Sequence, residues 1–268
     1  MKSKGGFTKK DFIVILGCAV FALANLGAIG SSGRRRAKEF VCLSNLLQWG
    51  TIFQMYCDDN NGYFFSGELS SGTDPGMGNY WRVIMKPYSR NVKMWLCPQA
   101  TKPLAVGTIP TGEQPWVAWQ APGEVGNDVG SYGFNGWALN LVLTPPSWAR
   151  LPASNYWRTY QVKGASNVPV FTDMWFVDAW PLERDRPPPK ETGPADTIGT
   201  DEMNRVCVNR HEGYVNGLFM DFSARSIGLK ELWTLKWHRS YNVNGPWTKA
   251  GGVRLGDWPE WMRDFPEY

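Results

Sequence analysis

The sequence predicts an α+β protein in which a long N-terminal helix, membrane-embedded in its first half, packs on a strand-rich antiparallel head. Residues 12–29 form an uncharged apolar run, and residues 34–58 repeat apolar side chains at steps of three and four. After residue 63, short apolar and aromatic runs alternate with turn residues. The 29 glycines and 19 prolines exclude a helical bundle. Helices followed by many strands are typical of the α+β class.

The pattern divides the chain into four segments. Glycines on both sides of a serine pair, at Gly30 and Gly33, predict a hinge after the apolar helix. The acidic turn cluster that ends at Gly62 predicts the end of the second helix. The expected segments are a leader (1–6), a transmembrane helix with its hinge (7–33), an amphipathic helix (34–62) and a globular β-rich head (63–268).

The net charge of +4 is unevenly distributed. The first 38 residues carry +7, so residues 39–268 carry −3. The head therefore lacks the basic face that nucleic-acid binding requires. The basic residues flank the apolar run, whose 18 residues would span about 27 Å as a helix, close to the thickness of a bilayer core. Three interpretations remain open, namely a processed prepilin helix, an uncut anchor and a secretory signal cut near Ala28.

The residues before the apolar run carry a second signal. A short basic leader ends in Gly6-Phe7, and Asp11 follows four residues later. This junction resembles the type IV prepilin signal. The resemblance implies cleavage after Gly6 by a prepilin peptidase, N-methylation of Phe7, and assembly through Asp11, which replaces the usual Glu and pairs with the amine of a neighbouring subunit. Lys9 and Lys10 depart from the apolar residues of that signal.

Further stretches resemble one family. Residues 42–63 combine Cys, Asn-Leu, Gln and Tyr with an Asp-Asp-Asn-Asn-Gly-Tyr ending. This pattern is similar to the pilin-like, type II secretion pseudopilin family of Planctomycetes and Lentisphaerae, whose members carry a C-terminal H-x9-DG domain. His211 and Asp221 match that last motif, with Phe222 in place of its Gly, and Asp173 ends another motif. The matching stretches in the head are residues 95–98, 131–136, 168–173 and 211–221.

The resemblance implies a structural subunit of a type II secretion pseudopilus or a related type IV pilin-like filament, assembled through its hydrophobic N-terminal helix after leader cleavage. The expected partners are the prepilin peptidase, other pilin-like subunits, the inner-membrane assembly machinery and membrane lipid, with no nucleic acid. The expected location is a single-pass inner-membrane protein with an extracytoplasmic head. The alternative is an uncut, membrane-anchored binding protein whose head, rich in tryptophan, binds a glycan or an envelope component.

The head is expected to contain several strands and one helical segment. Short apolar runs bounded by turn residues predict the strands, and apolar residues on neighbouring faces predict the helix. The expected strands are residues 92–96, 116–119, 132–143, 156–162, 168–175 and a hairpin at 218–227, and the expected helix is residues 229–238.

No catalytic residue, metal site or cofactor is expected. His211 and His238 are the only histidines, and no nucleophile motif such as Gly-x-Ser-x-Gly occurs. Cys207 and His211 have zinc-ligand spacing, but a second ligand pair is missing nearby. His211 is therefore interpreted as a structural residue that caps the hairpin, with Asp173, Asp178 or Asp221 orienting it. The protein is not expected to be an enzyme.

The pairing of the cysteines is left open. Cys42, Cys57, Cys97 and Cys207 lie outside the apolar run and allow three complete pairings. Cys42 and Cys57 are fifteen residues apart on one predicted helix, too far apart to bond to each other.

Overall fold

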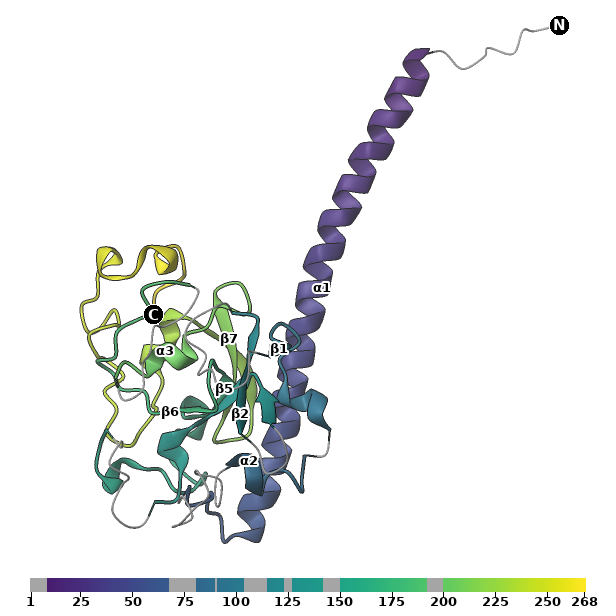
Figure 1. Ribbon diagram of the computed structural model, residues 1–268. Helices are drawn as coiled ribbons and strands as arrows, with labels where there is room; N and C mark the ends of the chain where they lie inside the picture. Colours follow the sequence, from purple (N-terminus) through teal and green to yellow (C-terminus); the bar gives the residue numbers. More distant parts are fainter. Residues whose placement is uncertain are drawn as a thin grey trace, which may run out of the picture.

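A computed structural model describes residues 9–67, 81–89, 91–103, 115–122, 127–141, 150–191 and 200–268, and their side chains except those of residues 11, 19, 22–29 and 31. The first element is helix α1 (Lys9–Asp59), which runs through Gly30 and Gly33 without the predicted break. Its first part projects away from the head and its second part lies against the sheet (Figure 1). Gly62, with a φ of 80°, ends the helix by donating its N–H to the carbonyl of Cys57 at 2.7 Å.

The centre of the head is a five-stranded sheet with the strand order β6-β4-β5-β7-β8. The β4–β6 pair is parallel, and the three other pairs are antiparallel. A smaller sheet contains β1, β2 and β3, in which β1 and β2 are parallel. The strands are β1 (Lys102–Pro103), β2 (Val117–Pro122), β3 (Asn127–Gly130), β4 (Tyr132–Asn135), β5 (Pro169–Asp173), β6 (Asp178–Ala179), β7 (Tyr214–Phe219) and β8 (Ala224–Gly228).

The other helical elements of the described residues are short. Helices α2 (Trp81–Ile84) and α3 (Met203–Val206) have four residues each. The remainder are 3-10 turns, which lie between the strands and in the C-terminal region. They are η1 (Val92–Trp95), η2 (Gly136–Ala138), η3 (Ala153–Asn155), η4 (Ala165–Asn167), η5 (Lys230–Thr234), η6 (Leu255–Asp257) and η7 (Glu260–Met262).

Parts of the predicted fold class and the predicted location require correction. The main sheet is mixed rather than antiparallel. A bilayer-spanning helix needs about 20 consecutive apolar residues. Within the described ranges, no helix combines the length and the apolar character that a crossing requires. The long apolar helix with a membrane-embedded first half and the single-pass inner-membrane location are therefore not supported.

The strand predictions were correct for the centre of the sheet and wrong at several turns. The strand predicted at 168–175 and the hairpin at 218–227 are confirmed by β5 and by β7 with β8. Residues 92–96, predicted as a strand, instead contain the 3-10 turn η1. Residues 229–238, predicted as a helix, contain the 3-10 turn η5. Residues 156–162 contribute only the bridge between Thr159 and Tyr63. A short apolar run does not distinguish a strand from a buried turn, because both bury their side chains.

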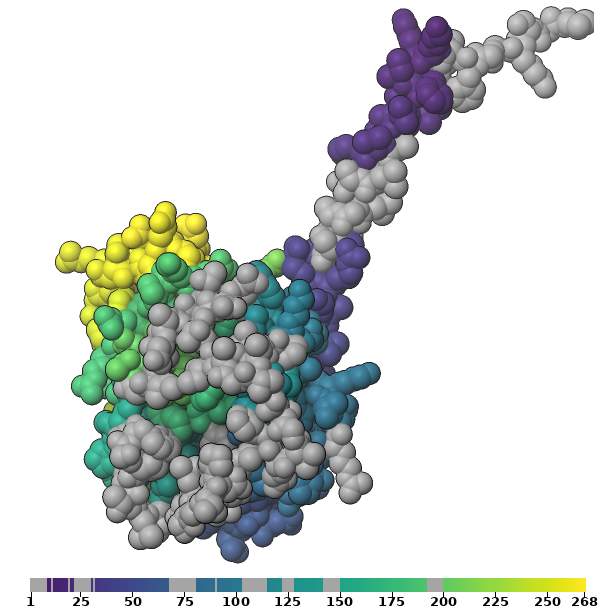
Figure 2. All heavy atoms as spheres, viewed as in Figure 1, coloured from purple at the N-terminus to yellow at the C-terminus, as the bar shows by residue number. Residues whose placement is uncertain are grey.

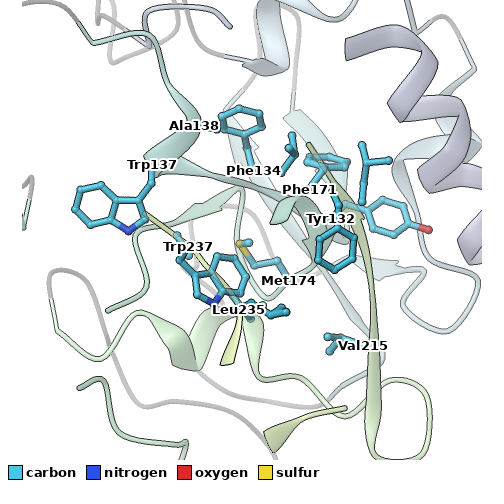
Figure 3. Packing of buried hydrophobic residues seen from close by; sticks show 14 of the residues in the cluster. Tyr132, Phe134, Trp137, Ala138, Phe171, Met174, Val215, Leu235 and Trp237 are labelled. Atoms are coloured by element: carbon cyan, nitrogen blue, oxygen red, sulfur yellow. The ribbon is translucent and has the colours of Figure 1, made fainter. Parts of the chain in front are cut away.

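The core lies between α1 and the main sheet and extends into the C-terminal turns. Figure 3 shows Tyr132, Phe171 and Met174 gathered on the sheet, with Leu235 and Trp237 of the C-terminal region beside them.

The hypothesis of a glycan-binding face was based on the large number of tryptophans. Eight of them are among the largest fully buried side chains, namely Trp49, Trp81, Trp119, Trp137, Trp175, Trp233, Trp237 and Trp258.

Gly50 sets the close approach of α1 to β7. A Cβ atom at this position would lie 2.9 Å from Cδ1 of Leu218 and 3.3 Å from the carbonyl oxygen of Phe222. Gly50→Val is therefore expected to lower the free energy of unfolding by about 1–3 kcal/mol, because overpacking forces the helix away from the sheet. Urea denaturation measures the change. Gly33→Val is the matched control, since a Cβ there meets nothing within 4 Å. An equal loss in both variants would contradict the packing argument.

Candidate metal centre

Four buried side chains from distant parts of the chain meet beside the main sheet. They are Cys42 on α1, Cys97 after η1, Asp173 at the end of β5 and His211 before β7. One sulfur, nitrogen or oxygen atom from each lies within 4.8 Å of the others. Cys42 and Asp173 are 131 residues apart in the sequence, and Cys97 and His211 are 114 apart. The cluster therefore exists only in the folded protein.

The sheet topology brings Asp173 and His211 together. Strands β5 and β7 are antiparallel, so the last residue of β5 lies beside the start of β7. The backbone N–H of Asn216 in β7 donates to Oδ2 of Asp173 at 3.0 Å. Glu212 and Gly213 have positive φ values of 54° and 96°, which turn the chain sharply between His211 and β7. This turn returns the imidazole of His211 to the carboxylate.

The two cysteines reach the same place from other elements. Cys42 belongs to the buried stripe of α1 that faces the sheet. The backbone N–H of Cys97 donates to Oγ of Ser131 at 2.5 Å, which fixes the loop after η1 next to β4. Tyr132 of β4 donates its hydroxyl to Sγ of Cys42 at 3.2 Å. Figure 3 shows the hydroxyl end of Tyr132 on the side of the sheet that faces the helix.

Several pairs of ligand atoms in the cluster lie within 3.7 Å of each other. Nε2 of His211 lies 3.4 Å from Sγ of Cys97 and 3.1 Å from Oδ2 of Asp173. Sγ of Cys42 lies 3.7 Å from the same Oδ2 atom. The thiol of Cys97 and the carboxylate of Asp173 thus approach a single ring nitrogen.

Arg210 supports the cluster through the carboxylate oxygen of Asp173 that His211 does not contact. Its Nη1 donates to Oδ1 of Asp173 at 3.1 Å, and neither side chain is exposed to solvent. The remaining guanidinium N–H groups donate to main-chain carbonyls, so the buried cation is fully hydrogen-bonded. These carbonyls belong to Pro115, Val117, Ser131 and Met174.

Burial and neighbouring groups shift the pKa values of the side chains in the cluster. Burial opposes ionisation of Asp173, but His211 and Arg210 together hold the pKa of this carboxyl below its usual value. Burial opposes a charge on His211, but Asp173 and Cys97 raise its pKa above the usual value. Burial likewise opposes a thiolate at Cys97, whereas contacts with Cys42 and His211 lower its pKa. Burial is the largest cause that raises the pKa of Cys42.

This arrangement differs from that of a Cys-His-Asp catalytic relay. A Cys-His-Asp relay needs the thiol on one imidazole nitrogen and the carboxylate on the other. Here both groups contact Nε2 of His211. The side chains of His211 and Asp173 are 2% and 0% exposed, so a substrate in solvent does not reach them. Two thiols, a carboxylate and an imidazole whose ligand atoms lie within 4.8 Å of one another are instead typical of a metal site.

The structure brings some predicted site residues together and separates others. Asp173 and His211 are in contact. Asp221 lies at the far end of β7, where its Oδ1 accepts hydrogen bonds from the backbone N–H and the hydroxyl of Ser223. Asp178 pairs with Arg205 and not with His211. Gly6 and Phe7 lie outside the described residues, as does the side chain of Asp11.

Sequence reasoning did not group Cys42 and Cys97 with these residues. The expectation of no metal site was based on spacing along the sequence, whereas the four residues come from separate segments. A usable signal was nevertheless present. The motif stretches 42–63, 95–98, 168–173 and 211–221 each contribute one member of the cluster.

The chain is thus an α+β protein with a mixed five-stranded sheet and a buried cluster of two cysteines, one aspartate and one histidine. Comparison with protein-family models, curated proteins and solved structures finds no match to this chain.

Proposed function

We propose that this protein is a structural subunit that polymerises through the first part of α1, in a type II secretion pseudopilus or a related pilin-like filament. The observation that carries the proposal is the exposed apolar surface of this helix. Phe12 and Phe21 are 66% and 73% exposed. The other exposed apolar side chains of this part include Ile13, Val14, Ile15, Leu16 and Val20.

These side chains surround the helix and do not form a stripe. An α-helix completes a turn in 3.6 residues, so five consecutive apolar positions at 12–16 cover every side. A helix that is apolar all round is buried in its functional state. Figure 2 shows this part of α1 standing clear of the head, so the head does not cover it. Second copies of the same helix, packed side by side, provide an apolar covering of matching shape.

The second part of α1 supports this interpretation, because its buried apolar residues lie on one face of the helix. Along the second part of α1, every third or fourth residue is buried against the sheet, as at Cys42, Leu46, Trp49 and Phe53. One helix therefore has two separate functions. Its second part stabilises the head, and its first part is available to neighbouring subunits.

Assembly is expected to fail when charges enter the exposed part of the helix. Val14→Asp combined with Leu16→Asp places two carboxylates in the proposed helix–helix contact, where burial of an unpaired charge costs several kcal/mol. Electron microscopy and sedimentation of the full chain should show filaments for the unsubstituted protein and monomers for the double variant. The melting temperature of the head should not change.

Val92→Asp is the matched control, because Val92 is 74% exposed but lies on the head. It is expected to assemble like the unsubstituted chain. A chain that stays monomeric at every concentration, or a double variant that forms filaments normally, would refute the proposal. A mass corresponding to removal of residues 1–6 and one added methyl, in protein isolated from the producing cells, would independently support the pilin-like assignment.

A further inference from the structure

The contact distances among Cys42, Cys97, Asp173 and His211 are close to those between the ligands of a tetrahedral metal site. Zinc binds sulfur at about 2.3 Å and nitrogen or oxygen at about 2.0–2.2 Å, so neighbouring ligand atoms lie about 3.3–3.8 Å apart. The nitrogen-to-sulfur distance is 3.4 Å and the sulfur-to-oxygen distance is 3.7 Å. The nitrogen-to-oxygen distance of 3.1 Å is slightly shorter. These three distances are within a few tenths of an ångström of the tetrahedral values, and all four ligand atoms lie within 4.8 Å of one another.

The charges also balance around a divalent cation. Two thiolates, one carboxylate and a neutral imidazole give a total of −1 with a dication, and the guanidinium of Arg210 brings the buried group to zero. Binding would release the thiol protons of Cys42 and Cys97 to solvent, together with any proton on Nε2 of His211. A neutral buried group avoids the large cost of an uncompensated charge in the core.

The surrounding hydrogen bonds match those of structural metal sites. Ligand atoms in such sites are oriented by outer partners. Tyr132 donates to Sγ of Cys42, and Asn216 donates to Oδ2 of Asp173, which leaves this oxygen a second lone pair for a metal. Arg210 holds the other oxygen of the same carboxylate.

We propose that Cys42, Cys97, Asp173 and His211 bind one zinc ion that fastens α1 to the sheet. Two sulfurs and an imidazole favour zinc over magnesium or calcium, which prefer oxygen ligands. The complete set of four protein ligands and its burial are typical of a structural ion and not of a catalytic one. This inference does not depend on filament assembly, because the cluster lies wholly within the head and the second part of α1.

The test uses the full chain, purified with its thiols reduced. Elemental analysis should find one zinc ion per chain. Replacement by Co²⁺ should produce the strong visible bands of tetrahedral coordination and a thiolate-to-cobalt charge-transfer band. Cys97→Ser and His211→Ala are expected to abolish stoichiometric binding. Tyr132→Phe, which removes only an outer hydrogen bond, should weaken the affinity about 10–100-fold.

Cys207→Ser is the matched control, because Cys207 is also buried and free but stands outside the cluster. It should keep one metal per chain and an unchanged cobalt spectrum. If Cys97→Ser fails to fold, the spectrum of the unsubstituted protein still decides the question. Absence of a charge-transfer band, or a Cys42–Cys97 disulfide without metal in the native protein, would overturn the proposal. Loss of metal in Cys207→Ser with retention in Cys97→Ser would also overturn it.

Discussion

Arg210→Met is expected to lower the free energy of unfolding by about 3–5 kcal/mol, because it removes one partner of a buried ion pair. Asp173 and Arg210 are both 0% exposed in their side chains, so water does not replace the lost cation. The substitution also leaves main-chain carbonyls without the guanidinium donors that now satisfy them, among them those of Pro115 and Met174. Urea denaturation of the full chain measures the loss.

Two further variants test whether the loss of stability is caused by burial of the ion pair or by the ion pair itself. Arg186 also forms a close ion pair, with Asp201, but its side chain is 76% exposed. Arg186→Met is therefore expected to change stability little, because solvent screens surface pairs. Arg210→Lys keeps the charge but not the planar set of donors, so its stability should fall between those of the unsubstituted chain and Arg210→Met. Equal stability of the Arg210→Met and Arg186→Met variants would contradict this account.

Asp185→Ala is the second substitution with a large expected effect, also about 3–5 kcal/mol. The Asp185 carboxylate accepts two hydrogen bonds from Arg150, at 2.7 and 2.6 Å. It also accepts the backbone N–H groups of Leu182 and Met203, at 2.9 and 3.1 Å. Alanine would leave the two backbone N–H groups without this acceptor, and the partly buried cation of Arg150 without its carboxylate partner.

Two controls test whether the loss of stability in Asp185→Ala is caused by loss of the acceptor oxygens and by their buried location. Asp185→Asn keeps an acceptor oxygen in the same place and should therefore lose less stability than Asp185→Ala. Asp221→Ala removes an exposed carboxylate that bonds only within its own turn, so a loss below about 1 kcal/mol is expected. The account would be wrong if Asp185→Ala and Asp221→Ala unfolded at the same urea concentration.

The centre of the sheet could be predicted from the sequence because its strands carry strong local signals. Residues 168–175 follow the turn residue Asn167 and are rich in β-branched and aromatic side chains, and β5 occupies most of them. The region around Trp95 has a similar composition but forms the 3-10 turn η1. The difference depends on tertiary contacts such as the hydrogen bond from the indole of Trp49 to the carbonyl of Met94.

Only two of the four cluster residues were identified from the sequence, because the grouping of all four also depends on tertiary contacts. Asp173 and His211 stood out through their motifs, but their contact depends on the antiparallel pairing of β5 with β7. Cys42 and Cys97 join them only after η1 packs against α1, where the indole of Trp49 donates to the carbonyl of Met94, and α1 packs on the sheet. Arg210 gave no sequence signal, because a single arginine next to a histidine is ordinary until its burial is known.

The placement of α1 against β7 and β8 has a consequence for synthesis on the ribosome. The chain emerges from its N-terminus, so α1 is complete long before its partners exist. Ser226 of β8 bonds to Glu39 of α1, 187 residues earlier. Until the strands of the main sheet have emerged, the apolar stripe of α1 that includes Leu46 and Trp49 lacks the partners that bury it, such as Phe171 of β5, whose ring centroid lies 5.1 Å from that of Trp49. The apolar stripe of the nascent chain is therefore exposed until these later segments have been synthesised.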